Sequence, residues 1–309
     1  MHDLTQSVTH AKVIVNPAAG AKSTHRRWPA ISRLLKHLGF SFDFEYTEGR
    51  GHAVELARAA AGDGYRNLVA VGGDGTVHEV ANGILSSGGA GDATLGIIST
   101  GTGSDFARSL GIPRHYEPAC SALVNGRTSQ IDVGVVEYTN EGKTLSRFFV
   151  NAAGVGFDAA VVEATERSTK RFRGTVPYVL GLLRTLAGYH NKSVILRLGD
   201  RTENTRIVTL VVANGAYYGG GMRVAPAANP RDGLLDIMVV RDMGKFALLR
   251  AFPRIYKGTH VTHPKVITDK ASEITIDTSE QVLVHADGEL LGEGPARFRI
   301  IPGALRVAG

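Results

Sequence analysis

The feature that most constrains this sequence is a pattern that occurs three times within its first 110 residues: an apolar run of strand length, a turn of small residues, and a helical pattern. The turns are Asn16–Gly20, Gly72–Thr76 and Gly101–Asp105. Strands that alternate with helices predict a parallel sheet, because parallel strands need a crossover connection. The carboxyl ends of parallel strands meet at one edge of the sheet, where ligands bind. The pattern therefore predicts one ligand site built from all three turns.

Strand and helix patterns alternate through residues 1–130. Ile31, Leu34, Leu35 and Leu38 repeat at the spacing of one helix face, and Gly39 is placed to end that helix. Similar patterns predict strands at 12–16, 42–47, 67–72 and 94–99, and helices at 53–61, 77–85 and 104–110. We therefore predict that residues 1–130 form an α/β domain with a doubly wound, mostly parallel sheet.

From about residue 131 to residue 309 short extended runs dominate the sequence. They predict strands at 131–138, 147–152, 194–198, 207–213, 234–240, 273–277, 281–286 and 296–301. Helical patterns occur at 159–166, at about 178–189 and at 245–257. Many strands at short spacing predict a β-rich, antiparallel, sandwich-like second domain. Its last strand is a candidate to return to the first domain.

Composition excludes several classes of protein. The chain has 309 residues, of which 43% are hydrophobic, as in ordinary globular domains. No apolar run approaches the roughly 18 residues of a membrane-spanning helix, and the polar first residues contain no signal peptide. The one cysteine, Cys120, has no partner for an internal disulfide and is expected to be buried. We expect a soluble, cytoplasmic protein.

The charge balance is basic, since 35 Lys and Arg minus 29 Asp and Glu gives +6. An excess of positive charge suits phosphate-bearing partners or an anionic membrane surface. Proteins that bind neither are also often basic, so the net charge by itself does not separate these classes.

The chemistry of the three turns points to a phosphate-bearing ligand. Glycine lets backbone N–H groups approach an anion closely, and the helix that follows adds partial positive charge. One such turn is more often an ordinary tight turn, whereas three at one sheet edge favour a phosphate site. No P-loop and no dinucleotide G-x-G-x-x-G motif occurs. Asp74 would repel phosphate unless a divalent cation lay between them, which favours Mg²⁺-dependent phosphoryl transfer.

Val71–Val80 (VGGDGTVHEV) resembles the glycine-rich signature of the diacylglycerol kinase catalytic-domain family, which includes sphingosine and ceramide kinases and bacterial lipid kinases. Further matches follow in the family's order over almost the whole chain: Asn16–Gly20, Gly101–Arg108, Ile131–Gly134, Asp232–Asp236 and Asp287–Glu289. The GGDGT run alone also fits NAD kinases and phosphofructokinase-like enzymes. The resemblance implies that residues 1–130 are a nucleotide-binding catalytic domain and that residues 131–309 are the lipid-substrate domain.

The resemblance also implies roles for individual residues. Asp74, Asp105 and Asp132 would hold the catalytic Mg²⁺, and Glu289 would be the general base. Asp232, with the backbone carbonyls of Asn229 and Leu234, would form a separate structural Mg²⁺ site. The implied ATP-binding set is Asn16, Pro17, Ala18, Ala19, Gly20, Thr47, Gly73, Asp74, Gly75, Thr76, Val77, His78, Glu79 and Thr102.

The residues alone leave other roles open for some of these positions. Asp132 on its own would be a turn residue, Glu289 a solvated carboxylate at a hairpin tip, and Asp232-Gly233 a hairpin turn. The sequence also departs from the family pattern in three places. Ser99 replaces a common proline, Ser104 replaces the usual asparagine, and His78 replaces an asparagine of many members. We expect altered hydrogen bonds there and not a loss of activity.

The function that the resemblance implies is an ATP- and Mg²⁺-dependent kinase that transfers the γ-phosphoryl group to a hydroxyl of a membrane lipid such as diacylglycerol. Such a protein would lie at the inner face of the membrane, and a basic cluster is placed to contact anionic headgroups or to be a solvated face: Arg167, Lys170, Arg171 and Arg173. No nucleic-acid partner is expected, and a homodimer stays open. The alternatives are a kinase of a soluble acceptor, similar to NAD kinases, and a non-catalytic nucleotide or lipid sensor.

Overall fold

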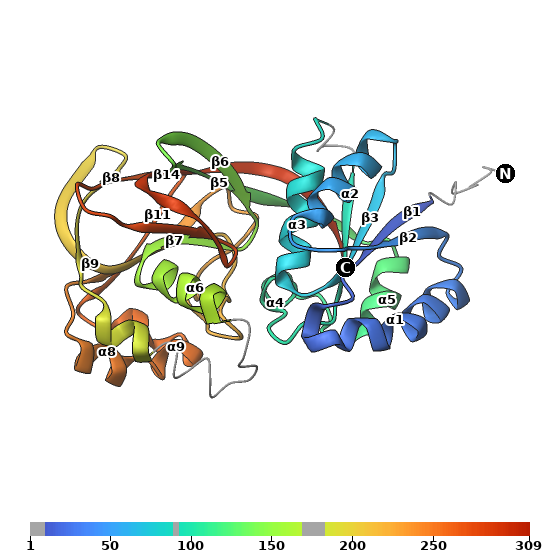
Figure 1. Ribbon diagram of the computed structural model, residues 1–309, viewed down its shortest axis with the longest axis horizontal. Coiled ribbons are helices and arrows are strands. Elements are labelled where there is room, and N and C mark those ends of the chain that lie inside the picture. The colour runs from blue at the N-terminus through green and yellow to red at the C-terminus, as the bar shows by residue number, and fades with distance from the viewer. Residues whose placement is uncertain (1–9, 89–92, 169–182) are drawn as a thin grey trace. The chain divides into compact units, whose positions relative to one another are not determined.

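The computed structural model describes residues 10–88, 93–168 and 183–309 (Figure 1). The chain forms two compact units, which are described separately. Unit 1 is Met1–Ile131 together with Ala304–Gly309, and unit 2 is Asp132–Gly303. The helix expected at 178–189 lies partly outside the described residues, and residues 183–188 of it are helical.

Unit 1 is an α/β unit. Its strands β1, β2, β3 and β4 pair in parallel in the order β2-β1-β3-β4, and the last residues of β14 pair in parallel with β4. The strands are β1 (Ala11–Val15), β2 (Phe42–Tyr46), β3 (Asn67–Gly72), β4 (Thr94–Ser99) and the end of β14 (Glu289–Ala308). The helices are α1 (Ala19–His37), α2 (His52–Gly62), α3 (Asp74–Leu85), α4 (Asp105–Leu110) and α5 (Tyr116–Val124).

Helices cover both faces of this sheet (Figure 1). On one face Ile31 and Leu35 of α1 and Cys120 of α5 pack with apolar residues of β1 and β3. On the other face α2 and α3 pack against each other closely, and only glycine fits at Gly83, where a Cβ would overlap Ala57. Cys120 is fully buried, and burial raises the pKa of its thiol to about 11. The cysteine is therefore a core residue, as predicted.

Unit 2 consists mainly of strands. The helices among its described residues are α6 (Phe157–Ser168), the helical residues 183–188, α8 (Lys245–Ala251) and α9 (Arg254–Lys257), with the 3-10 helix η1 (Thr259–Thr262). Its strands are β5 (Thr128–Asn140), which begins in unit 1, β6 (Lys143–Phe149), β7 (Ala152–Gly156), β8 (Lys192–Leu198), β9 (Arg201–Ala213), β10 (Leu235–Arg241), β11 (Val266–Ala271), β12 (Glu273–Asp277), β13 (Leu283–Ala286) and most of β14.

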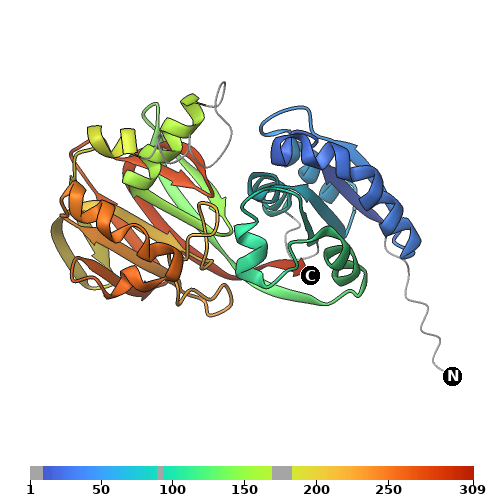
Figure 2. The same cartoon turned by 90° about the horizontal axis from the view of Figure 1, so that it is seen from below.

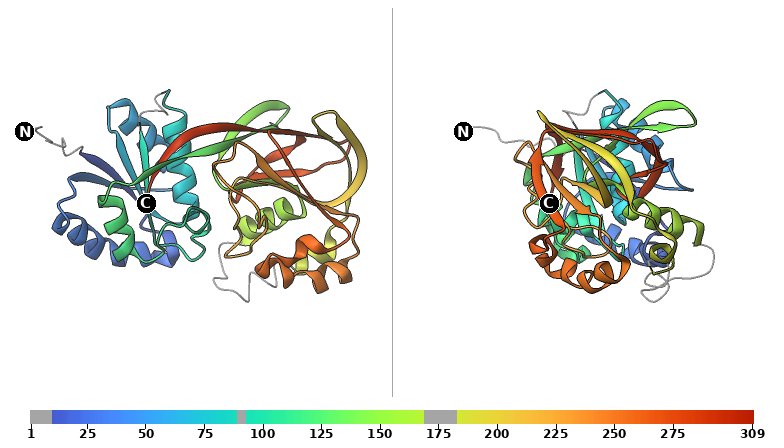
Figure 3. Two further views of the ribbon diagram at one scale, coloured as in Figure 1. Left: turned by 180° about the vertical axis from the view of Figure 1, so that it is seen from behind. Right: turned by 90° about the vertical axis from the view of Figure 1, so that its left-hand side faces the viewer.

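Two long strands of unit 2 each belong to two layers. The first half of β9 pairs with β8 and its second half with β7 and β10. In the same way β14 pairs first with β13 and then with β12, and all these pairs are antiparallel. Figure 3 shows β9, in yellow, bending round one end of the unit. Apolar side chains such as Phe149, Leu210 and Phe298 fill the space between the layers. The predicted combination of an N-terminal α/β domain and a β-rich antiparallel domain is confirmed.

The structure also contains elements that the sequence patterns did not predict. Helix α5 and strand β11 were missed. The strand expected at 147–152 covers only the end of β6 and the first residue of β7, so most of β6 was missed as well. The helix expected at 245–257 is two helices, because Pro253 caps the start of α9. Strand β6 has almost no buried residue, so it lacks the alternation that marks a strand. Within the described parts of the chain, no helix is both long and apolar enough to cross a bilayer.

Candidate active site

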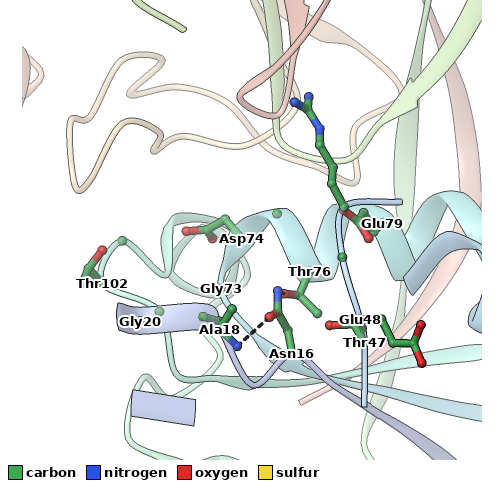
Figure 4. Close-up of a pocket in the computed structure, with 16 residues that line it drawn as sticks. Asn16, Ala18, Gly20, Thr47, Glu48, Gly73, Asp74, Thr76, Glu79 and Thr102 are labelled. Atoms are coloured by element: carbon green, nitrogen blue, oxygen red, sulfur yellow. Dashed lines mark hydrogen bonds between the residues drawn. The ribbon is translucent and has the colours of Figure 1, made fainter. Parts of the chain in front are cut away.

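The three glycine-containing turns of unit 1 meet at one edge of its sheet, directly after β1, β3 and β4. They surround a pocket of about 520 Å³ to which the turn after β2 also contributes. Figure 4 shows Asp74 and Thr102 at one end of this pocket and Thr47 and Glu48 at the other. The pocket is lined by Asn16, Ala18, Ala19, Gly20, Thr47, Glu48, Gly49, Arg50, Gly73, Asp74, Gly75, Thr76, Glu79, Gly101, Thr102 and Gly103.

Direct contacts hold the turns together. The Asn16 side chain donates a hydrogen bond to Thr76 Oγ1 (3.0 Å) and accepts one from the backbone N–H of Ala18 (3.0 Å), so it links the first two turns. The backbones of the second and third turns touch, because a Cβ on Gly101 would lie 2.7 Å from the Cα of Gly73. The small residues of these turns are therefore required for close packing as well as for ligand access.

Asp74 and Asp105 lie at the starts of α3 and α4, and their carboxylates face the same place. A Cβ on Gly103 would lie 2.9 Å from Asp74 Oδ2 and 3.4 Å from Asp105 Oδ2. The backbone N–H of Phe106 donates to Asp74 Oδ1 at 3.1 Å. Burial raises the pKa of Asp74 above its ordinary value, Asp105 raises it further, and the Phe106 N–H opposes this shift. A cation next to the two carboxylates would offset both unfavourable effects.

These residues fit a bound Mg²⁺. Within the described ranges, no group of three or more His, Cys, Asp and Glu side chains is arranged to hold a metal ion. Mg²⁺ in phosphoryl-transfer sites is commonly held by one or two carboxylates plus phosphate oxygens of the substrate. Asp74 and Asp105 supply such a partial set beside the pocket.

Asp132, which was predicted to complete this carboxylate cluster, belongs to unit 2. Its Oδ2 accepts the backbone N–H of Gly233 (2.7 Å) and its Oδ1 accepts that of Gly303 (2.8 Å). Its own N–H donates to the carbonyl of Pro230 (2.8 Å). This buried carboxylate therefore fastens the loop before β10 and strand β14 to β5, a role that neither its position after Ile131 nor the resemblance indicated.

Some predicted nucleotide-binding residues have structural roles. Glu79 lines the pocket, and its carboxylate accepts the N–H groups of Gly51 and Ala53 at the start of α2. Val77 and His78 are buried and do not line the pocket, because the helical turn of α3 places their side chains in the interior. Pro17 is also absent from the lining.

The pocket contains residues that the sequence reasoning did not assign to it. Glu48, Gly49 and Arg50 follow β2, so they reach the same sheet edge as the three recognised turns. Their position directly after the strand expected at 42–47 could have placed them at this edge of the sheet. Gly101 and Gly103 were expected at the ligand site as part of the third turn, but the ATP-binding set implied by the resemblance did not include them.

Two of the departures from the family pattern contact each other. The hydroxyls of Ser99 and Ser104 are buried and lie 2.6 Å apart, so they share a hydrogen bond. Ser104 has a left-handed backbone (φ 54°) at the start of α4, and the bond fastens it to the end of β4. The two serines thus satisfy each other, which is consistent with altered hydrogen bonding at an intact turn.

Glu289 follows a tight turn between β13 and β14. Asp287 and Gly288 both have positive φ (48° and 81°). The Asp287 carboxylate accepts three backbone N–H groups from Val150, Asn151 and Ala152 at 2.8–3.0 Å, which fixes the turn. Glu289 Oε2 accepts a charged hydrogen bond of 2.7 Å from Arg147. The sequence reasoning missed Asp287 and Arg147 as supports of Glu289, and Arg147 gave no local signal.

The residues predicted to hold a structural Mg²⁺ do not fit that ion. Lys270 Nζ lies 2.8 Å from Asp232 Oδ2 and 3.2 Å from Asp236 Oδ2. It also donates to the carbonyl of Ala227 (3.3 Å), and Asp232 Oδ1 accepts the N–H of Leu234 (3.1 Å). The ammonium group of Lys270 therefore supplies positive charge to both carboxylates, at the place next to Asp232 where the predicted ion would lie.

Backbone turns that can hold phosphates, beside carboxylates that can hold a cation, are what a phosphotransferase requires, and the fold and site define the chain as a member of that class. Two family models match it. The model described as "Diacylglycerol kinase catalytic domain" matches residues 10–136, and that described as "YegS C-terminal NAD kinase beta sandwich-like domain" matches residues 151–309.

Individual relatives agree with these matches. The chain is 33% identical over 301 residues to the diacylglycerol kinase of Mycobacterium tuberculosis (strain ATCC 25618 / H37Rv), covering 95% of this chain and 93% of that one. It is 27% identical over 289 residues to the diacylglycerol kinase of Bacillus subtilis (strain 168), covering 93% and 92%.

Solved structures share the fold. A crystal structure of a diacylglycerol kinase from Bacillus anthracis str. Sterne superposes with a TM-score of 0.72 at 23% identity, covering 97% and 96% of the chains. Yeast NADH kinase in complex with NADH gives a TM-score of 0.54 at 11% identity, covering 98% and 84%. The chain belongs to the diacylglycerol kinase family, and it is a kinase that transfers phosphate to an alcohol acceptor.

Proposed function

We propose that the protein is an ATP- and Mg²⁺-dependent lipid kinase that transfers the γ-phosphoryl group of ATP to a hydroxyl of a membrane lipid such as diacylglycerol. The observation that supports this most is the pocket of unit 1, where turns of the family's signature surround a space beside Asp74 and Asp105. The names of the relatives support a lipid as the acceptor.

Unit 1 binds the nucleotide in this proposal. Backbone N–H groups of the glycine turns, with the starts of α3 and α4, hold the phosphates. Arg50, at the rim formed after β2, contributes positive charge to the same pocket. Glu79 keeps that rim in place through its hydrogen bonds to Gly51 and Ala53.

Asp74 and Asp105 are the residues that would hold Mg²⁺. When bound, the ion neutralises charge on the phosphates during transfer. The N–H of Phe106 keeps the Asp74 carboxylate oriented towards the Gly103 position. Asp132 stays part of the proposed catalytic set, and its hydrogen bonds with the backbone of Gly233 and Gly303 give it a structural function as well.

Glu289 is the proposed general base, which accepts the proton of the lipid hydroxyl as the oxygen attacks the γ-phosphorus. The Asp287 turn fixes its backbone, and Arg147 holds one of its carboxylate oxygens. The guanidinium favours the ionised carboxylate, which is the form that can accept a proton.

Contact with a membrane is also part of the proposal. Of the predicted basic cluster, Arg167 is exposed at the end of α6 and pairs with Glu163 (2.8 Å). Lys170, Arg171 and Arg173 lie outside the described residues. Cytoplasmic location and the use of anionic headgroups by this cluster stay predictions.

The proposal is tested with purified full-length protein, Mg-ATP and a set of acceptors in mixed micelles: diacylglycerol, ceramide, sphingosine and, as soluble acceptor, NAD. The ATP is radiolabelled on its γ-phosphate, and the radioactivity of each separated phosphorylated product is measured. We expect product from a lipid and none from NAD. Product from NAD alone, or from no acceptor while ATP binds, would overturn the lipid kinase assignment.

A further inference from the structure

Helices α8 and α9 have apolar residues on two opposite sides. Leu248, Phe252 and Ile255 point inward and pack with the core of unit 2. Four others are exposed on the outside: Phe246 (81% exposed), Leu249 (41%), Pro253 and Tyr256 (50%). Figures 1 and 2 show both helices lying against the outside of the strands of unit 2. The inward positions are thus filled, and the outer side chains are exposed among the described residues, with the ring of Tyr256 touching that of Phe252.

These exposed apolar residues are grouped within a short part of the chain, residues 246–256. Among the described residues, three of the seven large exposed hydrophobic side chains are Phe246, Leu249 and Tyr256. Exposed apolar residues that are scattered singly need no explanation, whereas a group of them marks a place where another surface is bound.

The charge of the same segment is one-sided. Residues 243–268 contain no Asp or Glu, and they contain five basic residues: Lys245, Arg250, Arg254, Lys257 and Lys265. No described carboxylate forms an ion pair with these five, and the nearest acidic residue before the segment, Asp242, faces Arg206 and Asn191. Lys245, Arg254 and Lys265 donate to backbone carbonyls or a hydroxyl. The positive charge of the segment is therefore not neutralised within the described structure.

We propose that this α8–α9 surface, made of Phe246, Leu249, Pro253, Tyr256, Arg250 and Lys257, is where the protein docks on an anionic phospholipid bilayer. A short amphipathic element with aromatic and leucine side chains outward inserts them at the level of the headgroups and upper acyl chains. Tyrosine is favoured at that depth, and flanking Lys and Arg attract anionic headgroups.

The combination of charge and apolar groups selects this partner. A nucleic acid would complement Arg250 and Lys257, but it offers no apolar layer for Phe246 and Leu249. A second copy of this chain would cover Phe246, yet it would bring two unneutralised basic segments together. An anionic bilayer satisfies both features at once. The inference depends on the proposed function only in that a lipid kinase has to reach a membrane.

The experiment is co-sedimentation of the full-length protein, without ATP, with vesicles of phosphatidylcholine or of phosphatidylcholine plus phosphatidylglycerol. We expect binding to the anionic vesicles and weaker binding as the Debye length falls from about 8 Å at 0.15 M to about 3 Å at 1 M salt. Phe246→Ser with Leu249→Ser, and separately Arg250→Glu with Lys257→Glu, should each lower the partition coefficient at least about tenfold.

Matched controls change similar residues elsewhere. Leu145→Ser removes another exposed leucine (41% exposed), and Arg33→Glu with Lys36→Glu reverses two exposed charges on α1. These variants should bind vesicles as the wild type does. Melting temperatures within about 2 °C of wild type verify that all variants are folded.

The proposal is overturned if the Phe246 and Leu249 variant binds as wild type, if the controls lose as much binding, or if the wild type ignores anionic vesicles. The proposal is also overturned if the wild-type protein is a dimer and the Phe246 and Leu249 variant is a monomer, or if the wild-type protein binds RNA in preference to vesicles. Phosphorylation of a short-chain, water-soluble diacylglycerol separates the two proposals. The variants of the α8–α9 surface should phosphorylate the short-chain lipid at the wild-type rate. If the wild-type protein does not phosphorylate it, the kinase assignment is refuted, whereas the docking proposal is still decided by the vesicle-binding result.

Discussion

Replacing Lys270 with methionine tests whether an ammonium group serves as the cation next to Asp232. Methionine keeps much of the length of the side chain and removes its charge. The side chains of Asp232 and Asp236 are 26% and 11% exposed, and that of Lys270 is 35% exposed. Exposed ion pairs contribute about 0–1 kcal/mol and breaking a buried pair costs about 3–5 kcal/mol, so we expect this partly buried cluster to lose about 2 kcal/mol of unfolding free energy.

This loss can be followed as a shift in melting temperature. For a domain of about 150–250 residues, 1 kcal/mol shifts Tm by about 2–4 °C, so Lys270→Met should lower Tm by about 4–8 °C at neutral pH. Differential scanning calorimetry on the full-length protein measures it. Unit 2, which contains the whole cluster, is the part that should melt earlier.

The shift should depend on pH in a defined direction. Burial raises the pKa of Asp236 above 3.8, and Lys270 opposes that shift. Without Lys270 the pKa of Asp236 in the folded state rises further. A carboxyl whose pKa is raised by folding destabilises the protein above that pKa, and the penalty disappears as the pH falls through it. The difference in unfolding free energy between wild type and Lys270→Met should therefore become smaller as the pH is lowered from about 7 towards about 4.

Lys192→Met is the matched control, because Lys192 forms one longer ion pair (3.7 Å) with Glu280, whose side chain is more exposed (39%) than those of Asp232 and Asp236. It should cost less than about 1 kcal/mol. Adding Asp236→Asn to Lys270→Met should restore part of the lost stability, and EDTA should leave the wild-type Tm unchanged. The reasoning would be refuted if Lys270→Met lost no more stability than Lys192→Met, or if its loss of stability did not vary with pH. A fall in the wild-type Tm on adding EDTA would show that a bound metal ion does stabilise the protein.

Three further changes test the proposed active site. Glu289→Gln should lower kcat by a factor of about 10²–10⁴ with nearly unchanged ATP affinity. Its control, Glu293→Gln on the same strand, should keep the wild-type kcat. Equal kcat values for the two variants would reject Glu289 as the general base. Asp74→Ala should abolish activity that excess Mg²⁺ does not restore, and recovery with Mg²⁺ would show that the carboxylate is dispensable. Gly101→Ala should weaken ATP binding measured by calorimetry, because its Cβ would lie 2.7 Å from the Cα of Gly73; Gly62→Ala, which has open space around it, is the control.

Much of unit 1 could be predicted from local patterns. The alternation of strands and helices depends on residues within one turn of helix or a few residues of strand, so it appears in the sequence directly. The glycines after β1, β3 and β4 likewise marked the sheet edge where the pocket lies. The family, confirmed by the comparisons, followed from motifs that are short and contiguous.

Errors occurred where a local pattern was weak or ambiguous. Strand β6 has a mostly exposed surface, and α5 has a short apolar face of Ala119, Cys120 and Leu123. His78 stands within the glycine-rich signature, yet the rotation of α3 buries it beside Asn82. Motif membership indicates a segment's location, whereas the side-chain direction depends on the helix that contains it.

The sequence by itself determined most of the elements, the two fold classes, the family and the sheet edge that holds the candidate site. Only the tertiary structure decided which distant side chains meet. Arg147 and Glu289 are 142 residues apart in the chain, and Lys270 and Asp232 are 38 apart. These pairs depend on strand register, since Lys270 stands opposite Asp236 only in the observed pairing of β10 with β11. A shift of one residue would turn Lys270 to the other face of the sheet, and no local pattern in the sequence specifies that register.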